Sequence, residues 1–417
     1  MVDEHPPRGP LLLLEAATLA SGTGNGMVAV VFPWLALEQT GSATGAGIVA
    51  SATALPLLLS SLVAGSIIDR IGRRRSAIVS DVLSGVSVAA IPVVNHFFGL
   101  SVASLVAFAV LGAIFDPAGF SAREAMLPDV AAAAASPLER VNGIHEAVWG
   151  VAFVVGPGLG GILIGTIGAA AAMGVAGVGF GISSLLIWRL HFAGLEGHGG
   201  PTRASPTLTK SAASPLRHQL WAETKEGLRI VWHGRLLRSV LLLSAGLLAA
   251  YLPIEAVLFP VYFENQGRPE RMGFVITAFS AGGIAGALLY ATVGHRLPRR
   301  RCFVGSTVLA GIGLAAMSFL PSYPVLLAMA LFVGIAYGPI NPLVNLAVQT
   351  RTPIHARGRA TTLMNSAGYA AGPMGFILVG PLVEAVGIER TFQIVGAAVL
   401  VVALFSIPSK GLREFDT

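Results

Sequence analysis

The sequence predicts an all-α polytopic membrane protein, with twelve transmembrane helices in two pseudo-symmetric six-helix halves. Three observations predict this class. Of the 417 residues, 54% are hydrophobic and only 12% are charged, whereas soluble domains carry about 25% charged residues. Long apolar runs recur along the chain, and motifs in the first six runs are echoed in the last six. The 51 glycines fit this class too, because small residues let membrane helices approach closely.

The apolar runs have the length of about 20 residues that crosses a bilayer. We expect spans near residues 11–37, 43–68, 76–97, 100–122, 138–164, 167–190, 237–263, 272–294, 302–320, 324–348, 359–386 and 388–408. The first run has no cationic segment or cleavage site beside it, which indicates an uncleaved span and not a signal peptide. The predicted organisation is an N-terminal six-helix bundle (1–190), a cytoplasmic linker (191–236) and a C-terminal six-helix bundle (237–417).

The basic residues orient these spans. With both termini in the cytoplasm, all but three of the 27 lysines and arginines lie on the cytoplasmic side, the exceptions being Arg268, Arg271 and Arg390. Cytoplasmic loops of membrane proteins are enriched in these residues. We therefore expect a multi-pass protein of the bacterial cytoplasmic (inner) membrane. The net charge of +6 does not indicate a nucleic-acid partner, because the basic residues lie between apolar runs.

The segment between the halves has two parts. Residues 191–215 are rich in Gly, Ser, Pro and Thr, a composition typical of flexible linkers. Residues 216–238 alternate apolar and charged side chains at helical spacing. They predict an amphipathic helix, which lies either at the cytoplasmic membrane surface or in solvent as a connector.

Two pairs of motifs relate the halves to each other. SIIDRIGRRR (66–75) follows the second span, and ATVGHRLPRRR (291–301) follows the eighth. VVGPGLGG in the fifth span is echoed by AAGPMGFILVGP in the eleventh. Duplicated six-helix halves are typical of secondary transporters, whose substrate site lies near the membrane midplane between the repeats.

The motifs also carry a family resemblance. GSIIDRIGRRR (65–75) resembles the signature after the second helix of the major facilitator superfamily, and GPGLGG (156–161) resembles the antiporter motif in the fifth helix of its exporters. DPAGFSAREAMLPDV, ERVNG, EGLRIVW and HARGRATT resemble the subgroup that holds siderophore exporters and Tap-type tetracycline and aminoglycoside efflux pumps. The similarity to the Tap-type pumps covers nearly the whole chain. It implies the major facilitator fold and proton-coupled drug export.

The resemblance implies a cytoplasmic gate at the end of the second span. Its residues would be Gly65, Asp69, Arg70, Gly72, Arg73 and Arg123. An acid beside a helix N-terminus is stabilised by the helix dipole. We expect Asp69, Arg70 and Arg73 to pair with the start of the eleventh span or with Arg123. The alternative is that the arginines only anchor the topology, which we favour for Arg74 and Arg75.

The matched antiporter motif comprises Gly156, Pro157, Gly160 and Gly161. Together with Gly158 it also spells G-x-G-x-x-G, but a dinucleotide site needs that pattern between a strand and a helix. Here the pattern lies inside an apolar span, so no cofactor is predicted. Pro157 should bend the helix, and the glycines should allow close packing. In the family, such a bend is associated with preventing leak in exporters.

Glu255 is an acid inside the seventh span, in YLPIEAVLF. A carboxylate there costs about 2.5–3.5 kcal/mol on insertion scales. Ser244, Tyr251 and Tyr262 share its helix face by spacing, and in the resembled family the first, fourth, seventh and tenth helices line the central cavity. Burial favours the neutral carboxyl, so that the group can exchange protons. Glu255 would carry protons, bind a cationic drug, or make a structural hydrogen bond to a neighbouring helix.

Other acids in the spans have two interpretations each. Asp116 shares a face with Arg123, which favours an ion pair, with proton transfer as the alternative. Glu146 and Trp149 follow helical spacing and suit an amphipathic cation, or else the tryptophan packs against lipid or the core. Asp81 and Glu15 lie near the cytoplasmic ends, where we expect them to reach water.

Neutral polar side chains complete the candidates. On the first, tenth and eleventh spans they are Thr18, Ser21 and Asn25; Tyr337, Asn341 and Asn345; and Asn365 and Tyr369. They would orient a substrate in a largely apolar pocket or join helices by hydrogen bonds. Members of the resembled family often carry an acid where this chain has Asn25, so proton transfer is not expected at that position.

The sequence therefore predicts a proton-coupled multidrug efflux antiporter that exports amphipathic drugs, such as tetracyclines or aminoglycosides, by alternating access. The alternative is a siderophore or other metabolite exporter of the same fold. An intramembrane enzyme is disfavoured because H-E-x-x-H and G-x-S-x-G are absent, and the buried acids disfavour an uncoupled facilitator. We expect an amphipathic small molecule, protons and lipid as partners, no nucleic acid, cofactor or metal, and a monomer.

Overall fold

The computed structural model describes residues 9–190, 225, 227–353 and 357–416. Every regular element in these ranges is helical, and none of the described residues forms a strand. The side chains of Asp69, Asn365 and Tyr369 lie outside the described residues, as does most of the predicted linker. Residues 227–233 of that linker are helical, and Val231 is buried among the side chains of the second half.

The first six helices coincide with the first six predicted spans. They are α1 (Gly9–Thr40), α2 (Ala43–Ile71), α3 (Arg73–Phe98), α4 (Val102–Ala133), α5 (Leu138–Ile167) and α6 (Ala169–Arg189). α1 packs against α5 and α6, and α3 packs against α4 and α6. Gly72 makes the turn from α2 to α3 with a φ of 86°, a conformation that glycine adopts without steric cost.

The remaining spans form the second half. Their helices are α9 (Arg235–Pro253), α10 (Phe259–Glu264), α11 (Pro269–Val293), α12 (Arg299–Met317), α13 (Tyr323–Tyr337), α14 (Ile340–Arg351), α15 (Arg357–Val386) and α16 (Ile388–Leu404). Two predicted spans are interrupted. A wide turn, η2 (Ile254–Leu258), separates α9 from α10. Gly338 and Pro339 separate α13 from α14, because proline cannot donate the helical hydrogen bond at its position.

Length and apolar composition support the membrane assignment. Nine stretches of the described chain are long and apolar enough to cross a membrane, and α12, α15 and α16 occupy the other three predicted spans. Large apolar side chains are exposed on the outside of the bundle, for example Val178, Ile182 and Leu185 along α6. The all-helical, twelve-span fold class predicted from the sequence is confirmed.

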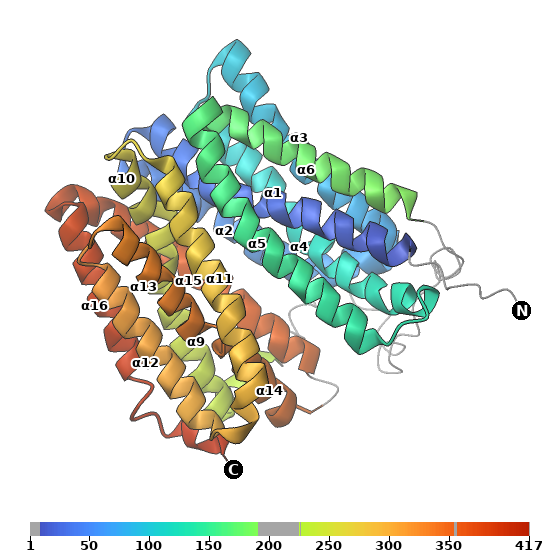
Figure 1. Ribbon diagram of the computed structural model, residues 1–417, viewed down its shortest axis with the longest axis vertical. Coiled ribbons are helices and arrows are strands. Elements are labelled where there is room, and N and C mark those ends of the chain that lie inside the picture. The colour runs from blue at the N-terminus through green and yellow to red at the C-terminus, as the bar shows by residue number, and fades with distance from the viewer. Residues whose placement is uncertain (1–8, 191–224, 226, 354–356, 417) are drawn as a thin grey trace, which may run out of the picture.

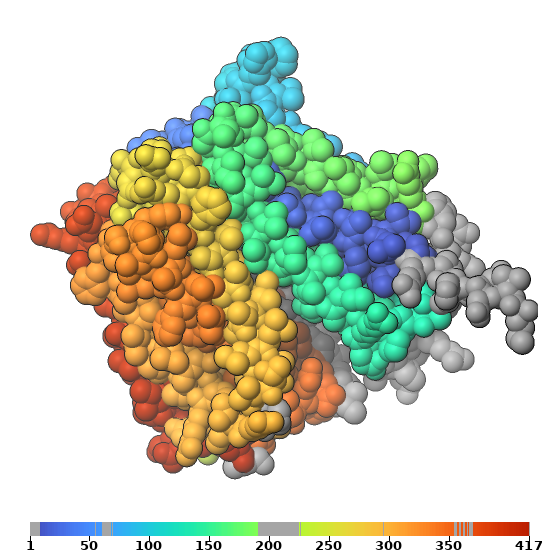
Figure 2. Space-filling model, viewed as in Figure 1, coloured from blue at the N-terminus to red at the C-terminus, as the bar shows by residue number. Residues whose placement is uncertain are grey.

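The two halves meet through two helix pairs, α2 with α15 and α5 with α11. Figure 1 shows the two groups of helices close together near α10 and diverging toward α14. Figure 2 shows α5 and α11 in contact along the boundary between the halves. At the close end, the backbone N–H of Thr44 donates to Glu384 Oε1 at 3.2 Å. The contact therefore joins the start of α2 to the end of α15.

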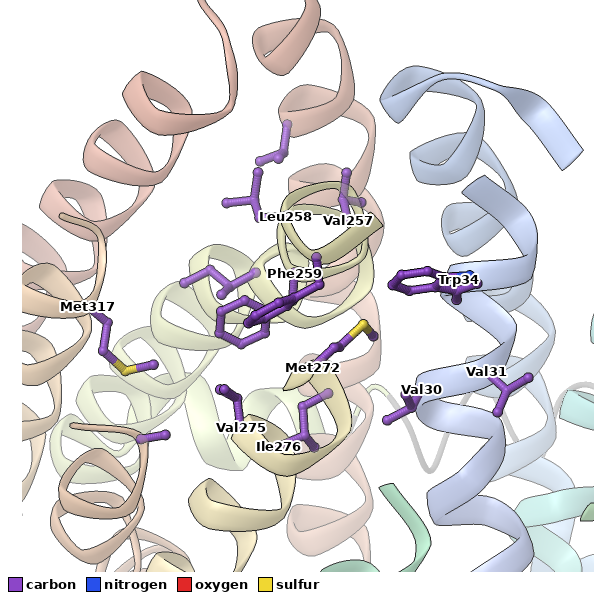
Figure 3. Packing of buried hydrophobic residues seen from close by; sticks show 14 of the residues in the cluster. Val30, Val31, Trp34, Val257, Leu258, Phe259, Met272, Val275, Ile276 and Met317 are labelled. Atoms are coloured by element: carbon purple, nitrogen blue, oxygen red, sulfur yellow. The ribbon is translucent and has the colours of Figure 1, made fainter. Parts of the chain in front are cut away.

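A shared apolar core also joins the halves at this end. Trp34 of α1 lies 5% exposed in one cluster with Val257, Phe259 and Met272 of the second half. Figure 3 shows Val30 and Trp34 of α1 facing the side chains of η2, α10 and α11. Close van der Waals packing drives the association of helices in a membrane, so this end of the interface is held by packing.

Candidate functional site

A wide helical turn holds Glu255 in the middle of the seventh span. The backbone N–H of Phe259 donates to Ile254 O, five residues earlier, which defines a π-helical turn. Pro260 follows directly and has no N–H, and its ring would clash with a carbonyl four residues earlier in a regular helix. Turns of this kind inside α-helices occur frequently at functional sites. Pro260 thus favours a backbone conformation at Glu255 that differs from a regular α-helix.

Glu255 is half-buried and bonded to a tyrosine of its own helix. The hydroxyl of Tyr251 donates to Glu255 Oε1 at 2.5 Å. The Tyr251 ring stacks on Phe279 of α11 at 5.1 Å between centroids, and Phe279 lies 6.1 Å from Tyr337 of α13. An apolar pocket beside them is lined by Leu247, Phe279 and Tyr337, among others. The carboxyl of Glu255 therefore lies beside aromatic rings from α9, α11 and α13.

The predicted polar stripe along this span is divided by the wide turn. Tyr251 precedes the turn and reaches Glu255, whereas Tyr262 follows it and packs 6.0 Å from Phe392 of α16. The extra residue in a π-helical turn rotates the following residues about the helix axis, so a seven-residue spacing no longer gives one face. Ser244 is on the near side, and its buried hydroxyl has no hydrogen-bond partner among the described residues.

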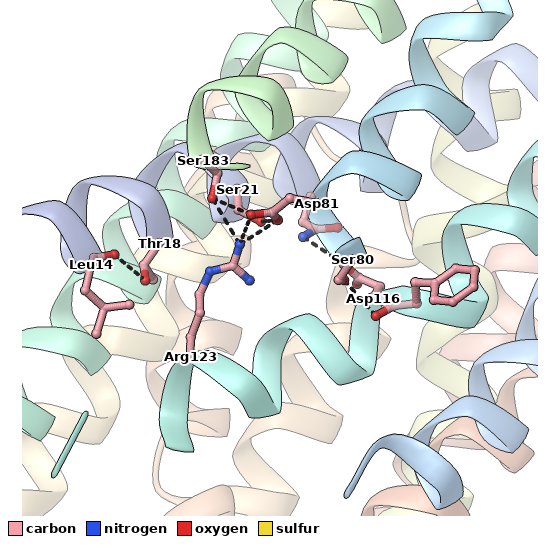
Figure 4. Close-up of polar contacts among 10 residues, drawn as sticks. Leu14, Thr18, Ser21, Ser80, Asp81, Asp116, Arg123 and Ser183 are labelled. Atoms are coloured by element: carbon pink, nitrogen blue, oxygen red, sulfur yellow. Dashed lines mark hydrogen bonds and ion pairs between the residues drawn. The ribbon is translucent and has the colours of Figure 1, made fainter. Parts of the chain in front are cut away.

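Asp81 and Arg123 form a buried ion pair in the first half. Nη2 of Arg123 donates to both carboxylate oxygens of Asp81, at 2.5 and 2.6 Å, and both residues are 2% exposed. Ser183 donates to Asp81 at 2.7 Å and Ser21 donates to it at 3.1 Å. Figure 4 shows these four side chains converging from α3, α4, α6 and α1. The cluster therefore fastens four helices together.

This cluster corrects two expectations. Asp81 was expected to reach water, but it is buried because Arg123 neutralises its charge and two hydroxyls donate to it. Arg123 was expected to pair with Asp116 or with the gate residues. Its partner is Asp81 instead, on the neighbouring helix α3, since the carboxylate of Asp81 meets the guanidinium directly.

Asp116 of α4 is joined to α1 by Asn25. Asn25 Nδ2 donates to Asp116 Oδ1 at 3.2 Å. Both side chains are half-buried, and Figure 4 shows Asp116 on the part of α4 next to Ser80 of α3. The amide of Asn25 thus contacts a carboxyl of another helix, at the position where the resembled family often has an acid.

A second buried acid, Glu15, lies against His145. Both Glu15 oxygens are 3.2 Å from His145 Nδ1, and the side chains are 7% and 2% exposed. On the other side of the ring, Trp149 Nε1 donates to His145 Nε2 at 3.2 Å. Because an indole N–H can only donate, Nε2 must accept, and the neutral ring carries its proton on Nδ1 toward Glu15. Glu15, expected to reach water, is instead enclosed by this pairing.

Trp149 connects this chain of hydrogen bonds to an aromatic group. Its ring lies 5.0 Å from Phe120 of α4 and 5.8 Å from Phe153 of α5. Glu146 is exposed and does not lie in the buried chain that joins Glu15, His145 and Trp149. The proposed binding of an amphipathic cation by Glu146 and Trp149 stays a prediction, and the described partner of the Trp149 ring on its own helix is His145, which packs edge-on to it.

The predicted gate residues are only partly described. Arg73 Nη1 lies 2.6 Å from Asp129 Oδ2 and donates to Ala125 O at 2.9 Å, which fastens the start of α3 to α4. Arg73 was expected to pair with the eleventh span or Arg123, but Asp129 is the acid within its reach. Arg70 is exposed. The side chains of Gly65 and Asp69 lie outside the described residues, so their predicted roles stay predictions.

The glycine motif of α5 lies between two helices. An added Cβ at Gly156 would come within 2.7 Å of Thr23 O on α1, and one at Gly161 within 2.8 Å of Pro269 O on α11. Thr277 of α11 donates to Val154 O at 2.7 Å. Alternate faces of the motif thus allow α1 and α11 to approach the α5 backbone, one from each half. Pro157 and Gly160 lie on the α1 side, beside Gly26 and Met27.

Some of the neutral polar candidates make hydrogen bonds within or between helices, and others are exposed. Thr18 donates to its own helix at Leu14 O, and Ser21 donates to Asp81. Asn341 and Asn345 are exposed on α14. Asn365 and Tyr369 fall outside the described side chains. The structure brings Asn25 to Asp116 and Tyr251 to Glu255, and it brings none of the described candidates of α14 to either acid.

Sequence reasoning missed Asp81, Glu15 and Ser183 as members of buried clusters. A usable signal was available for Asp81, since it shares α3 with buried serines at Ser80, Ser84 and Ser87, a polar face in an apolar span. Their partners lie on other helices, which periodicity within one helix does not show. Among the described residues, no group of three His, Cys, Asp or Glu side chains could hold a metal ion.

Comparison with known proteins places this geometry in a family. A model of the Major Facilitator Superfamily matches residues 14–267 and 255–414. The chain is 42% identical over 412 residues to the multidrug efflux pump Tap of Mycolicibacterium fortuitum, covering 98% of each chain. It is 43% identical over 415 residues to the multidrug efflux pump Tap of Mycobacterium tuberculosis, with 98% of this chain and 95% of the relative covered.

A solved structure shares the fold. The nucleoside transporter NupG superposes with a TM-score of 0.70 at 13% sequence identity, covering 95% of this chain and 98% of the other. At this identity the likeness supports the arrangement of the helices alone.

Proposed function

Because the chain belongs to the major facilitator superfamily, we propose that it is a multidrug efflux transporter that works by alternating access. The family membership expected from GSIIDRIGRRR and GPGLGG is confirmed, and the protein is a multi-pass membrane transporter and not an enzyme. The proposed substrates are amphipathic drugs such as tetracyclines or aminoglycosides. The support for drug export is the similarity to two Tap multidrug efflux pumps over nearly the full chain.

The proposed coupling ion is the proton, and the proposed carrier is Glu255. The observation behind this choice is its setting: a half-buried carboxyl at a π-helical turn, bonded to Tyr251 of the same helix. The tyrosine hydroxyl can donate to the carboxylate or accept from the neutral acid by rotating. Glu255 can therefore change its protonation state without breaking a contact between helices.

Alternating access gives the proposed order of events. Glu255 takes up a proton from the outside while a cationic or amphipathic substrate leaves. It then releases the proton toward the cytoplasm, and the ionised carboxyl attracts the next substrate. We propose that the protein acts as a monomer in the bacterial inner membrane with both termini in the cytoplasm, as the distribution of lysines and arginines favours.

This orientation implies a conformational state of the transport cycle for the structure. The contacts between Thr44 and Glu384 and between Gly161 and Pro269 lie at the end where α1 finishes and α2 begins. With a cytoplasmic N-terminus, this end is the outer one. The structure then corresponds to an inward-facing state, closed outside by the apolar core around Trp34 and Phe259.

A transport assay tests the proposal. Purified protein in liposomes with an imposed pH gradient should move tetracycline or an aminoglycoside against its concentration gradient, and collapse of the pH gradient should stop it. Glu255→Gln keeps size and hydrogen bonding but cannot titrate, and it should lose proton-driven transport. Glu264→Gln, an exposed position at the end of α10, is the matched control. Undiminished gradient-driven transport by Glu255→Gln would sink the proposed coupling role.

A further inference from the structure

A cavity inside the first half lies apart from Glu255. It has a volume of about 190 Å³ and lies between α1, α2, α3, α4 and α6. Its walls are mainly apolar, with the rings of Phe32, Phe108 and Phe180 among them. Since every lining residue belongs to the first half, the cavity does not depend on how the two halves are arranged.

Two polar groups in this cavity have hydrogen-bonding capacity left over. Asp116 receives one hydrogen bond among the described residues, from Asn25 at 3.2 Å, although a carboxylate can accept about four. The hydroxyl of Ser84 lines the same cavity, is 4% exposed, and has no hydrogen-bond partner in the described part of the chain. Buried polar groups are normally satisfied, so the unused capacity of Asp116 makes it a candidate for binding a ligand in this cavity.

The charge of Asp116 indicates what kind of ligand the cavity would bind. Asp81, one helix away, is neutralised by Arg123 at 2.5 Å, whereas no ion pair to Asp116 exists among the described residues. A carboxylate in an apolar setting is unstable unless it takes up a proton or pairs with a cation. An ammonium group would compensate the charge. Phenyl rings around it add favourable cation–π contacts of about 0.5–2 kcal/mol.

The cavity volume limits the size of the ligand. An engineered apolar cavity of about 150 Å³ binds benzene. A cavity of about 190 Å³ therefore suits one aromatic ring with a short aminoalkyl chain.

We propose that this cavity of the first half binds organic ammonium ions, with the nitrogen at Asp116 and the apolar part among Phe32, Phe108 and Phe180. The role of the cavity in transport, as a site for the cationic part of a substrate, rests on the proposed export function. Binding itself can be measured without transport.

Calorimetric titration of the purified full chain in lipid nanodiscs tests the site. The probe is phenethylammonium, and the matched uncharged ligand is 2-phenylethanol. The wild-type protein should bind the cation at least tenfold more tightly than the alcohol. Asp116→Asn should weaken phenethylammonium at least tenfold and leave 2-phenylethanol within about twofold, because only the charge is removed.

A second pair of variants covers the possibility that Asp116→Asn does not fold. Ala109 lines the cavity one turn from Ala113, so Ala109→Phe should fill it and abolish binding of both ligands. Ala107→Phe adds the same ring to an exposed position of α4 and should leave both affinities unchanged.

The outcomes separate the site from the export function. The cavity assignment is overturned if the wild-type protein does not bind phenethylammonium, or if Ala109→Phe binds it normally. The role of Asp116 is overturned if Asp116→Asn keeps the preference for the cation. Drug transport without phenethylammonium binding would refute this site and leave export standing. Binding without any drug transport would refute export and leave the site standing.

Discussion

The first half of the molecule ties its buried charges to partners on other helices, whereas the second half bonds its buried carboxyl within one helix. Asp81 is held by Arg123 and by hydroxyls from two further helices. Glu255 is held by Tyr251, four residues earlier. A charge shared among four helices cannot change state without loosening the bundle. A carboxyl bonded within its helix can, and this difference is the reason that coupling is proposed for Glu255 and not for Asp81.

The largest effect should follow from breaking the shared charge. Asp81→Ala leaves Arg123 buried without its counter-ion, and loss of one partner of a buried pair costs about 3–5 kcal/mol. Thermal unfolding of the purified protein in detergent should show a large drop in the melting temperature. The double variant Asp81→Leu with Arg123→Met, which removes both charges, should recover most of the loss.

The pair Arg73–Asp129 provides the control. Its side chains are 22% and 24% exposed, and partly solvated pairs contribute about 0–1 kcal/mol. Asp129→Ala should therefore shift the melting temperature far less than Asp81→Ala does. Equal shifts would contradict the view that the cluster at Asp81 fastens four helices.

The next effect concerns the contact between the halves. Gly161→Ala places a methyl group within 2.8 Å of Pro269 O, and overpacking of this kind costs about 1–3 kcal/mol. The variant should populate states in which α5 and α11 separate. Gly165→Ala is the control, because its Cβ would lie 3.6 Å from Pro269 Cγ, an ordinary contact.

Spin labels attached to cysteines introduced at the exposed positions of Thr166 and Gln266, in a Cys302→Ser background, would report this separation. The distance between the labels is measured by double electron–electron resonance. Gly161→Ala should add a longer distance, and Gly165→Ala should match the parent protein. Identical distributions in both variants would show that the close approach at Gly161 does not hold the halves together.

The smallest effect should come from His145. His145 donates to Glu15 and accepts from Trp149, so a side chain that can do neither should change the emission of Trp149. Glutamine can donate to Glu15 and accept from Trp149. His145→Gln should therefore keep stability within about 1 kcal/mol and leave the emission of Trp149 nearly unchanged, whereas His145→Leu should change it.

The measurement is the difference in emission between the protein and Trp149→Phe, in the wild-type, His145→Gln and His145→Leu backgrounds. An unchanged emission of Trp149 in His145→Leu would contradict the hydrogen bond between Trp149 and His145.

The comparison between the halves also shows what the sequence could and could not predict. Apolar length and the arginine pattern suffice for twelve spans, since each depends on one segment at a time. Glu255 stood out for the same reason, as an acid in an apolar run. Asp81 and Glu15 did not, because the partners that keep them buried come from helices 42 and 130 residues away.

One backbone feature also escaped the sequence patterns. The π-helical turn at Ile254–Leu258 changed the face on which Tyr262 lies, because a fixed 3.6-residue period assumes an uninterrupted helix. Pro253 and Pro260 were visible in the sequence, yet proline in a membrane helix can be accommodated by a kink, a break or a wide turn. The wide turn is the form found here, and it packs against α2 and α15.

Substrate-induced proton release tests the central claim, that Glu255 exchanges a proton for a substrate, most directly. Purified protein in weakly buffered detergent solution, with a pH-sensitive dye, receives a saturating pulse of a transported drug. The wild-type protein should release close to one proton per molecule, and Glu264→Gln should do the same. Glu255→Gln should bind the drug and release none. Equal proton release by wild type and Glu255→Gln would contradict the account and assign the proton to another group.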